Sequence, residues 1–599
     1  MFRLVKEIIS EAHQGDQDQL GIIFSDEKRI LVEAPAGCGK THLMISKIAY
    51  LLATKQVPST KQILALTFSV NAAYKVKKDS FEKIPALLSQ VGQPQLDSRN
   101  KIFATNYHGL ARRILRLYGY LISEHFKNID NFKSIDESNQ QSLSNLGIGL
   151  SFEDTMTLSS VANAIKNRDV DTLRNLHDQY VKLVRTALIP NGYIPYNAIL
   201  IIAKDLLNSY PHIANGYRNI FSHYIVDEFQ DTNILSLEFL LALINAESKI
   251  MFMGDSLQRI YGFIGAVPDL IKLAESTLAM TKHELTTNYR FKDNHYLLSI
   301  DRVIRENAVV TCDEIARSSA VLKVFSCPDQ TSEALAVSKL VNYLLAQEPP
   351  GKVAILVRQR GRNTNILIDT LDENQIDYFY ALFTDDDSEY IRFHSEARKA
   401  FFDLIAEANT FNKIISDRLV KHVIANFKLE NAKYFQSLTV LLATFLNNIF
   451  VKHGHLSTEE KISFVRDTLE GNALKQSLGD VYSRIVVTTV HAAKGLEWDY
   501  VILSDFEPST YPHYYGMCRF CNKQSICDLV VDNSLSKDIL NGFYDEISVF
   551  YVAATRAKND LYITYSNTGI ANNGTLVRKN VSCFLKLPGI TLQHHNFPS

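Results

Sequence analysis

The 599-residue sequence lacks several features that would place it in a special class of protein. Its seven cysteines show no disulfide framework, which indicates a reducing compartment. A net charge of −2 excludes a broadly basic surface, although local basic patches can still bind nucleic acid. Charges interrupt the first seven residues too early for a signal peptide. The longest apolar run, 438–450, holds two asparagines and is too short to span a bilayer. We therefore expect a cytoplasmic protein with no membrane partner.

A glycine-rich turn follows the apolar run 30–32. It reads Ala34, Pro35, Ala36, Gly37, Cys38, Gly39, Lys40 and Thr41. A strand that ends in such a turn and continues as a helix forms a phosphate cradle, because backbone N–H groups and the helix dipole hold the β-phosphate. Lys40 is then expected to reach the β- and γ-phosphates, and the Thr41 hydroxyl to bind Mg²⁺. The turn predicts a nucleoside triphosphate site.

Two adjacent acids end a second apolar strand, 224–226. Asp227 is suited to hold Mg²⁺, and Glu228 to orient or deprotonate the attacking water. A solvated turn is the alternative interpretation, but in a chain with a phosphate cradle the pair predicts hydrolysis. The two motifs lie about 185 residues apart, too far for one compact sheet. The polar, helix-patterned stretch 118–205 is therefore expected to form an insertion.

Seven motifs in this order and spacing resemble the UvrD/Rep/PcrA family of superfamily 1 DNA helicases. Beyond the two motifs above, they occupy residues 66–73, 254–263, 288–290, 488–499 and 551–557. The resemblance implies an ATP-dependent DNA helicase and single-stranded DNA translocase that moves 3′ to 5′. It also implies ATP and Mg²⁺ as cofactors, and single-stranded DNA and single-strand/duplex junctions as partners.

The resemblance also assigns roles to individual residues. Those expected to act in hydrolysis are Lys40, Glu228, Gln258, Arg290 and Arg556, with the two arginines as fingers to the γ-phosphate. The nucleotide is expected to contact the cradle residues 34–41 together with Gln19, Tyr289, Arg290, Gly495, Glu497 and Arg556, while Thr41 and Asp227 hold the metal. The expected DNA contacts are Phe68 and Phe263 by base stacking, and Asn106, His108 and Arg112 on the backbone.

The expected fold is α/β, with two RecA-like cores of mainly parallel sheet, each carrying a mostly helical insertion. The first core would combine residues 1–105 and 206–280 around an insertion at 106–205. The second would combine 281–387 and 481–599 around a small insertion at 388–480.

Departures from the family pattern leave two alternatives. Ile264 stands where the family usually has arginine, and the segment 388–480 is small. Both mildly favour a helicase-like ATPase subunit of a larger nuclease-containing complex, in antiphage defence or repair. The other alternative is an ATP-dependent DNA clamp that does not step. The intact set of Lys40, Glu228, Gln258, Arg290 and Arg556 argues against it.

A further pattern, H-x₄-C-x₂-C-x₅-C, lies outside the family motifs at His513, Cys518, Cys521 and Cys527. The Cys-x₂-Cys pair has the spacing of zinc ligands, and four ligands suffice for a tetrahedral site. Burial of the thiols among neighbouring aromatic residues is the alternative. A structural zinc is thus predicted alongside ATP and Mg²⁺.

Overall fold

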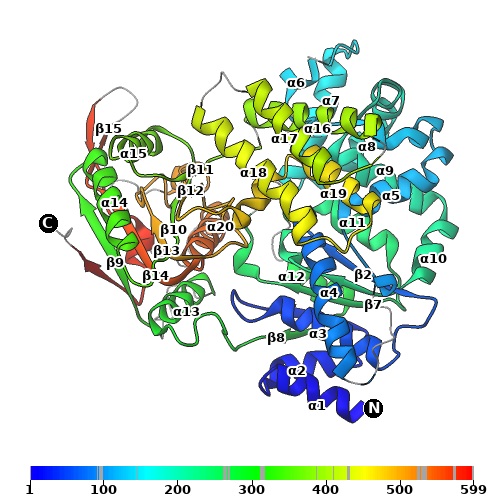
Figure 1. Ribbon diagram of the computed structural model, residues 1–599, viewed down its shortest axis with the longest axis horizontal. Helices are drawn as coiled ribbons and strands as arrows, with labels where there is room; N and C mark the ends of the chain where they lie inside the picture. The colour runs from blue at the N-terminus through cyan, green and yellow to red at the C-terminus, as the bar shows by residue number, and fades with distance from the viewer. Residues whose placement is uncertain are drawn as a thin grey trace. The chain divides into compact units, whose positions relative to one another are not determined.

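The computed structural model describes residues 2–90, 92, 99–144, 146–260, 266, 270–309, 318–385, 387–408, 410–427, 432–521, 527, 536–570 and 575–595. The chain forms two compact units, each described here by itself. Unit 1 consists of Met1–Ser256, Tyr261–Thr287 and Lys452–Gly471. Unit 2 consists of Leu257–Ile260, Asn288–Val451 and Asn472–Ser599. Figure 1 labels the helices and strands of both.

Unit 1 is built on a six-stranded sheet in the order β3-β2-β6-β7-β1-β8. Its strands are parallel: β1 (Arg29–Glu33), β2 (Gln62–Thr67), β3 (Ile102–Asn106), β6 (Phe221–Val226), β7 (Lys249–Gly254) and β8 (Thr281–Glu284). Successive side chains of a strand point to opposite faces. Ile30 and Val32 accordingly lie in one hydrophobic core and Leu31 in the other. The sheet is therefore covered on both faces, as parallel sheets are.

The helices of unit 1 divide between these two cores. The core of Ile30 and Val32 is formed with α1 (Phe2–Ala12), α2 (Gln17–Phe24), α3 (Lys40–Ala53) and α4 (Val70–Gln90). The core of Leu31 is formed with α5 (Tyr107–Tyr118), α9 (Tyr196–Ser209), α11 (Ile234–Leu243) and α12 (Leu270–Leu278). Between β3 and β6 the chain adds α6 (Gln140–Ser144), α7 (Phe152–Asn167), α8 (Val170–Leu183), α10 (Pro211–Ile220) and the short pair β4 (Lys133–Ile135) and β5 (Tyr193–Pro195).

A late segment of the chain also belongs to unit 1. Helix α19 (Thr458–Glu470) begins with a capping box at Ser457 and contacts α4. Phe464 stacks on Tyr74 with ring centroids 3.6 Å apart, and His455 stacks on Phe81 at 4.5 Å. Aromatic stacking thus attaches residues 452–471 to the unit that starts the chain.

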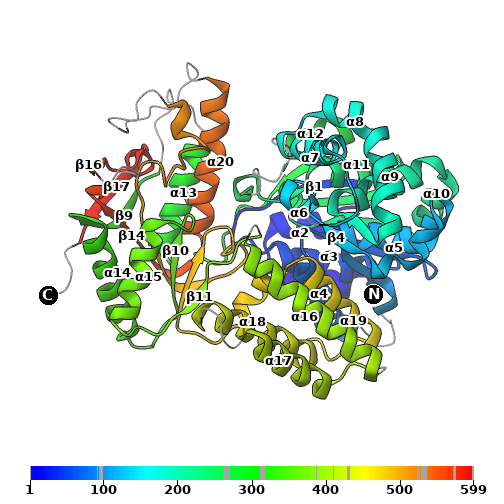
Figure 2. The same cartoon turned by 90° about the horizontal axis from the view of Figure 1, so that it is seen from above.

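Unit 2 has a seven-stranded parallel sheet in the order β11-β12-β10-β13-β14-β9-β17. Its strands are β9 (Ala320–Cys327), β10 (Val353–Val357), β11 (Phe379–Ala381), β12 (Ile485–Thr489), β13 (Trp498–Leu503), β14 (Ala557–Ser566) and β17 (Ile590–His594). In Figure 2, α14 (Gln330–Leu345) and α15 (Arg362–Glu373) lie on one side of it, and α13 (His295–Val309) and α20 (Lys537–Ala554) on the other. A small antiparallel pair, β15 (Thr568–Ile570) and β16 (Leu576–Arg578), follows β14. The expected α/β class with mainly parallel sheets is confirmed.

Three helices extend unit 2 between β11 and β12: α16 (Ser388–Ala408), α17 (Lys413–Phe427) and α18 (Ala432–Val451). The stretch Lys433–Val451 of α18 is long and apolar enough to cross a membrane by length and composition alone, and half of it is buried in the protein. The buried side chains recur at the helical period, at Leu438, Leu441, Leu442, Phe445, Leu446 and Ile449. Helix α18 therefore packs as a core helix, with α17 as a neighbour.

Candidate active site

The phosphate cradle joins the carboxyl end of β1 to the start of α3. Gly37 and Gly39 have φ values of 82° and 81°, a left-handed conformation that glycine adopts without strain. The Ala34 N–H donates to the Gly254 carbonyl over 2.8 Å, which ties the entry of the loop to the end of β7. The first turn of α3 carries Lys40 and Thr41, so the loop has the backbone shape and the side chains of a triphosphate and Mg²⁺ site.

The predicted acid pair lies beside this loop. Lys40 Nζ is 3.3 Å from Glu228 Oε1 in an ion pair whose side chains are 13% and 29% exposed. Burial alone would lower the pKa of Lys40, but the charges of Glu228, Asp227 and Asp255 raise it above its usual value. Burial and the charge of Glu228 raise the pKa of Asp227 to about 6. The acids therefore crowd negative charge around one lysine, an environment that a divalent cation relieves.

Backbone geometry fixes Glu228. Its φ of 52° is left-handed, which is uncommon for a residue with a Cβ and frequent at functional sites. The Glu228 N–H donates to Asp227 Oδ1 over 3.0 Å. The turn thus leads the Glu228 carboxylate to Lys40 and Gln230, while Asp227 Oδ1 accepts the N–H of Glu228.

Gln230 is a site residue that the sequence analysis missed. Its Nε2 donates to Glu228 Oε2 over 2.5 Å, and its Oε1 accepts from the Asp255 N–H over 3.2 Å. A Cβ on Gly254 would lie 2.6 Å from Gln230 Oε1, so a larger residue there would push the Gln230 amide out of this position. The available signal was a polar residue two positions after Glu228 at the end of a buried strand. Gln230 connects the acid pair to the end of β7.

Gln19, the expected adenine contact, is held inside unit 1. It is 1% exposed, and its Nε2 donates to the Cys38 carbonyl of the cradle over 3.0 Å. Its Oε1 bonds His13 Nδ1, and His13 Nε2 lies 2.8 Å from Ser46 Oγ. His13 and Ser46 were not predicted, because no local pattern marks a histidine that acts on a residue six positions later. The amide of Gln19 is in this way connected to the phosphate loop.

The four described residues expected to contact DNA lie in unit 1. Phe68 follows β2 and is half-buried. Asn106 caps α5, since its Oδ1 accepts from the Gly109 N–H over 2.7 Å. The His108 ring stacks on Tyr196 at 3.8 Å, and burial followed by the charge of Arg112 lowers the pKa of His108 to about 3.

Arg112, the fourth of these residues, is paired within unit 1. Its Nη2 donates to Ser134 Oγ over 2.6 Å and lies 3.4 Å from Glu470 Oε2. The fifth expected contact, Phe263, and the neighbouring Ile264 lie outside the described residues.

Unit 2 brings several of the other predicted residues together around Thr555. Arg290 Nη1 donates to the Thr555 carbonyl over 2.9 Å, and Arg290 forms an ion pair with Glu497. Arg556 is 2% exposed and donates to Thr555 Oγ1, Val552 O and Leu496 O over 2.8–3.1 Å.

The remaining predicted residues of unit 2 lie on neighbouring segments. Tyr289 is half-buried next to Arg290. Gly495, with φ 80°, precedes Leu496. The Gln258 carbonyl accepts from Lys494 Nζ over 2.8 Å.

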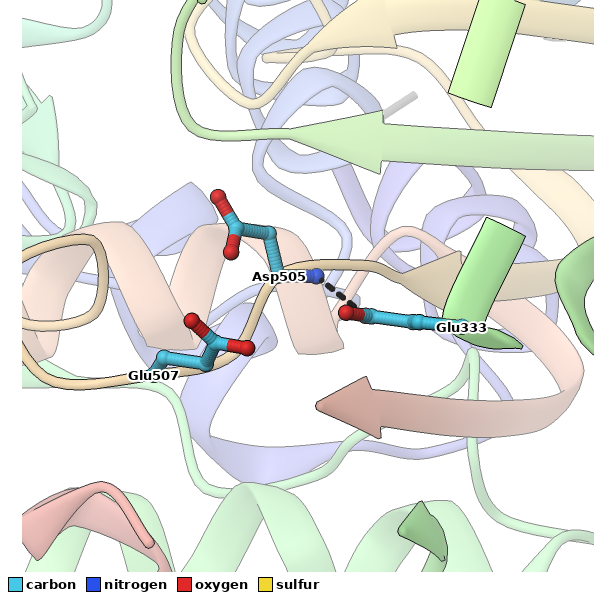
Figure 3. A group of neighbouring side chains, drawn as sticks. All are labelled: Glu333, Asp505 and Glu507. Carbon is cyan, nitrogen blue, oxygen red and sulfur yellow. Dashed lines mark hydrogen bonds between the residues drawn. The ribbon is translucent and has the colours of Figure 1, made fainter. Parts of the chain in front are cut away.

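Among the described residues, one group of three possible metal ligands lies within 4.8 Å: Glu333, Asp505 and Glu507 (Figure 3). Its oxygens already have partners within the protein, because Glu507 is ion-paired with Lys579, and Glu333 Oε1 accepts from the Asp505 N–H and from Thr564 Oγ1. This group is a structural polar network. Over the same described part of the chain, no three of His513, Cys518, Cys521 and Cys527 meet that distance, so the predicted zinc set is not assembled as a metal site.

A cradle lysine paired with a strand-end glutamate, on a parallel sheet, defines a P-loop nucleotide hydrolase. Two family profiles match the chain: the UvrD/REP helicase N-terminal domain over residues 16–279 and the UvrD-like helicase C-terminal domain over residues 454–568. The chain belongs to the UvrD-like family of ATP-dependent DNA helicases.

Named relatives agree with this assignment. The chain is 24% identical to a probable DNA helicase II homolog of Mycoplasma capricolum, covering 92% of this chain and 84% of that protein. It is 24% identical to DNA helicase II of Rickettsia typhi, covering 93% and 92%. It is 23% identical to the ATP-dependent DNA helicase PcrA of Staphylococcus epidermidis, covering 95% and 84%.

Proposed function

We propose that the protein is an ATP-driven motor that steps 3′ to 5′ along single-stranded DNA and opens duplexes at single-strand/duplex junctions in the cytoplasm. The observation that carries the proposal is the intact hydrolytic set of unit 1, in which Gln230 bonds Glu228 and Glu228 pairs with Lys40. A clamp that only binds nucleotide has no need of a positioned base.

In this proposal the residues of unit 1 hold the nucleotide. Thr41 and Asp227 would hold Mg²⁺, whose charge stabilises the β- and γ-phosphate oxygens when it is bound. Lys40 would bind those phosphates, and Glu228 would accept a proton from the attacking water. The raised pKa of Asp227 fits a carboxylate that functions next to a cation.

The residues of unit 2 supply the remaining roles. Arg290 and Arg556 would act on the developing charge of the γ-phosphate, a contribution of about 10³–10⁵-fold where arginine fingers have been measured. Both arginines bond Thr555, so this one residue holds the two side chains near each other. The domain limits remain a prediction: residues 106–205 and 388–480 would form the mostly helical insertions of the two cores.

The first test is steady-state ATP hydrolysis with and without single-stranded DNA. Glu228→Gln is expected to abolish DNA-stimulated turnover, by at least about 10²-fold, because it removes the base. Glu238→Gln is the matched control, since Glu238 lies on α11 and pairs with Lys204 of α9, away from the cradle.

Duplexes with a 3′ or a 5′ tail then test direction. Unwinding of the 3′-tailed substrate alone supports the proposal, and unwinding of the 5′-tailed substrate alone overturns the direction. Hydrolysis that DNA does not stimulate would favour the alternative of a subunit in a nuclease-containing complex. Nucleotide-dependent DNA binding with no hydrolysis would favour the clamp.

A further inference from the structure

Both ends of the Gln19 amide are bonded within unit 1. The Cys38 carbonyl can only accept a hydrogen bond, so the nitrogen of the amide faces it, and Nε2 donates to this carbonyl over 3.0 Å. The oxygen of the amide then faces His13, whose Nδ1–H donates to Gln19 Oε1. Because only 1% of Gln19 is exposed, the side chain offers almost no surface to a bound base.

His13, which holds the oxygen end of the amide, is itself fixed from two other directions. Its Nε2 lies 2.8 Å from Ser46 Oγ on α3, and its ring stacks on that of His42 at 4.2 Å. A chain of bonds therefore runs from α3 through His13 and Gln19 to the phosphate loop. Gln19 occupies the link of this chain that touches the loop.

Recognition of adenine would require a different arrangement of the amide. A glutamine reads adenine when its oxygen accepts from N6–H and its nitrogen donates to N7, and such a bidentate pair discriminates against another base by roughly 5- to 150-fold. To form these two bonds, Gln19 would have to give up those to His13 and Cys38. Two bonds would be exchanged for two, so ATP would gain little over a nucleotide that leaves the amide in place.

We propose that Gln19 braces the phosphate loop and does not read the base, so that the protein hydrolyses GTP as readily as ATP. This inference rests on the proposed function, because it concerns the substrate of the same nucleotide site. The other expected contacts agree with it. The loop N–H groups, Lys40 and Thr41 would bind phosphates and Mg²⁺, which are common to both nucleotides. The Tyr289 ring would stack on either purine, because every base has a π-face.

The hydrolytic step is the same for both nucleotides. Water attacks the γ-phosphorus, the bond from this atom to the oxygen that bridges it to the β-phosphate breaks, and Glu228 accepts a proton from the water. The products are the nucleoside diphosphate and inorganic phosphate. The base is not among the reacting atoms, so it affects the rate only through binding and positioning.

Displacement of a fluorescent nucleotide tests base recognition on wild-type protein without any hydrolysis. Methylanthraniloyl-ADP is bound in the presence of Mg²⁺, and ADP and GDP are compared as competitors. Dissociation constants within about 5-fold of each other are expected, because a bidentate contact to the base would separate them by more. A larger preference for ADP would overturn the proposal.

The second measurement is kcat/KM for ATP and for GTP in the presence of single-stranded DNA. Gln19→Ala is expected to lower both values by a similar factor and to leave their ratio unchanged, because it removes a brace of the loop and no contact to the base. Gln17→Ala is the matched control, since Gln17 lies on the same helix, is exposed and donates to the Gly15 carbonyl over 2.9 Å. It should change neither value.

The two measurements separate this inference from the proposed function. A decrease in Gln19→Ala that is confined to ATP would show that Gln19 reads adenine and would overturn the inference. Hydrolysis that DNA does not stimulate, together with equal affinities for ADP and GDP, would contradict the proposed motor and support the inference.

Discussion

Replacing His13 by alanine is expected to weaken nucleotide binding while leaving the chemical step intact. Burial, followed by the charge of His42, lowers the pKa of His13 to about 4, so the ring is neutral near pH 7. A neutral ring with its proton on Nδ1 satisfies both neighbours, because it donates to Gln19 Oε1 and accepts from Ser46 Oγ. This ring therefore fixes the amide that holds the cradle at the Cys38 carbonyl.

The size of the effect follows from what alanine leaves behind. The Gln19 side chain is buried, and its Oε1 would lose the His13 donor. A buried acceptor without its partner costs about 1–3 kcal/mol. If this cost destabilises the conformation that binds nucleotide, the affinity for nucleotide falls by roughly 5- to 150-fold.

The assay is the KM for ATP and for GTP together with kcat, measured beside a His42→Ala control. His42 stacks on His13 at 4.2 Å, so the control removes the ring neighbour and keeps the Gln19 bond. A rise in KM for both nucleotides at nearly constant kcat is expected if Gln19 acts through the cradle. A rise for ATP alone would show that Gln19 acts on the base. An unchanged KM in His13→Ala, or an equal change in the control, would refute the reasoning.

Three further outcomes are expected. Burial raises the pKa of Glu137 from 4.5 to about 7, so the protein loses about 3 kcal/mol of stability as the pH rises from 4.5 through 7 and this carboxyl ionises. Glu137→Gln should flatten that loss, measured by urea unfolding at pH 5–8. An unchanged dependence of the unfolding free energy on pH would contradict the prediction. Phe464→Ala removes the 3% exposed ring that stacks on Tyr74 and should lower the local stability of residues 452–471 by about 3–5 kcal/mol. Proteolysis within this segment should then be faster than in wild type, and equal cleavage would disprove the attachment. Arg556→Lys cannot reproduce three separate guanidinium bonds and should lower kcat at least about 10²-fold in protein that is still folded at the assay temperature, whereas near-normal kcat would remove Arg556 from the mechanism.

The parts of the site that the sequence predicted are those encoded locally. The cradle and the acid pair each follow an apolar strand directly, so the strand positions them and a short motif identifies them. The mainly parallel sheets, in contrast, were expected from the resemblance to the helicase family. Tertiary contacts are different, because no periodic pattern in the sequence shows that His13 bonds Gln19 or that Gln230 bonds Glu228.

The same distinction applies to the predicted zinc set and to helix α19. The spacing of Cys518 and Cys521 suggested a pair of ligands, but spacing along the chain does not show whether four side chains meet in space, and within the described residues no three of the predicted four do. Residues 458–470 follow the helices of unit 2 in sequence, and tertiary contacts such as the stacking of Phe464 on Tyr74 show that they pack in unit 1.

The stacking of Phe464 on Tyr74 also has a consequence for folding during synthesis on the ribosome. The last strand of the first sheet, β8, ends at Glu284, yet unit 1 is complete only at Gly471. At about 5–20 residues per second, the ribosome needs on the order of 25 to 90 seconds to reach that residue. Until α19 is synthesised, it cannot cover the face of α4 that carries Tyr74. Unit 1 therefore either completes its folding late or keeps this face covered by another protein until then.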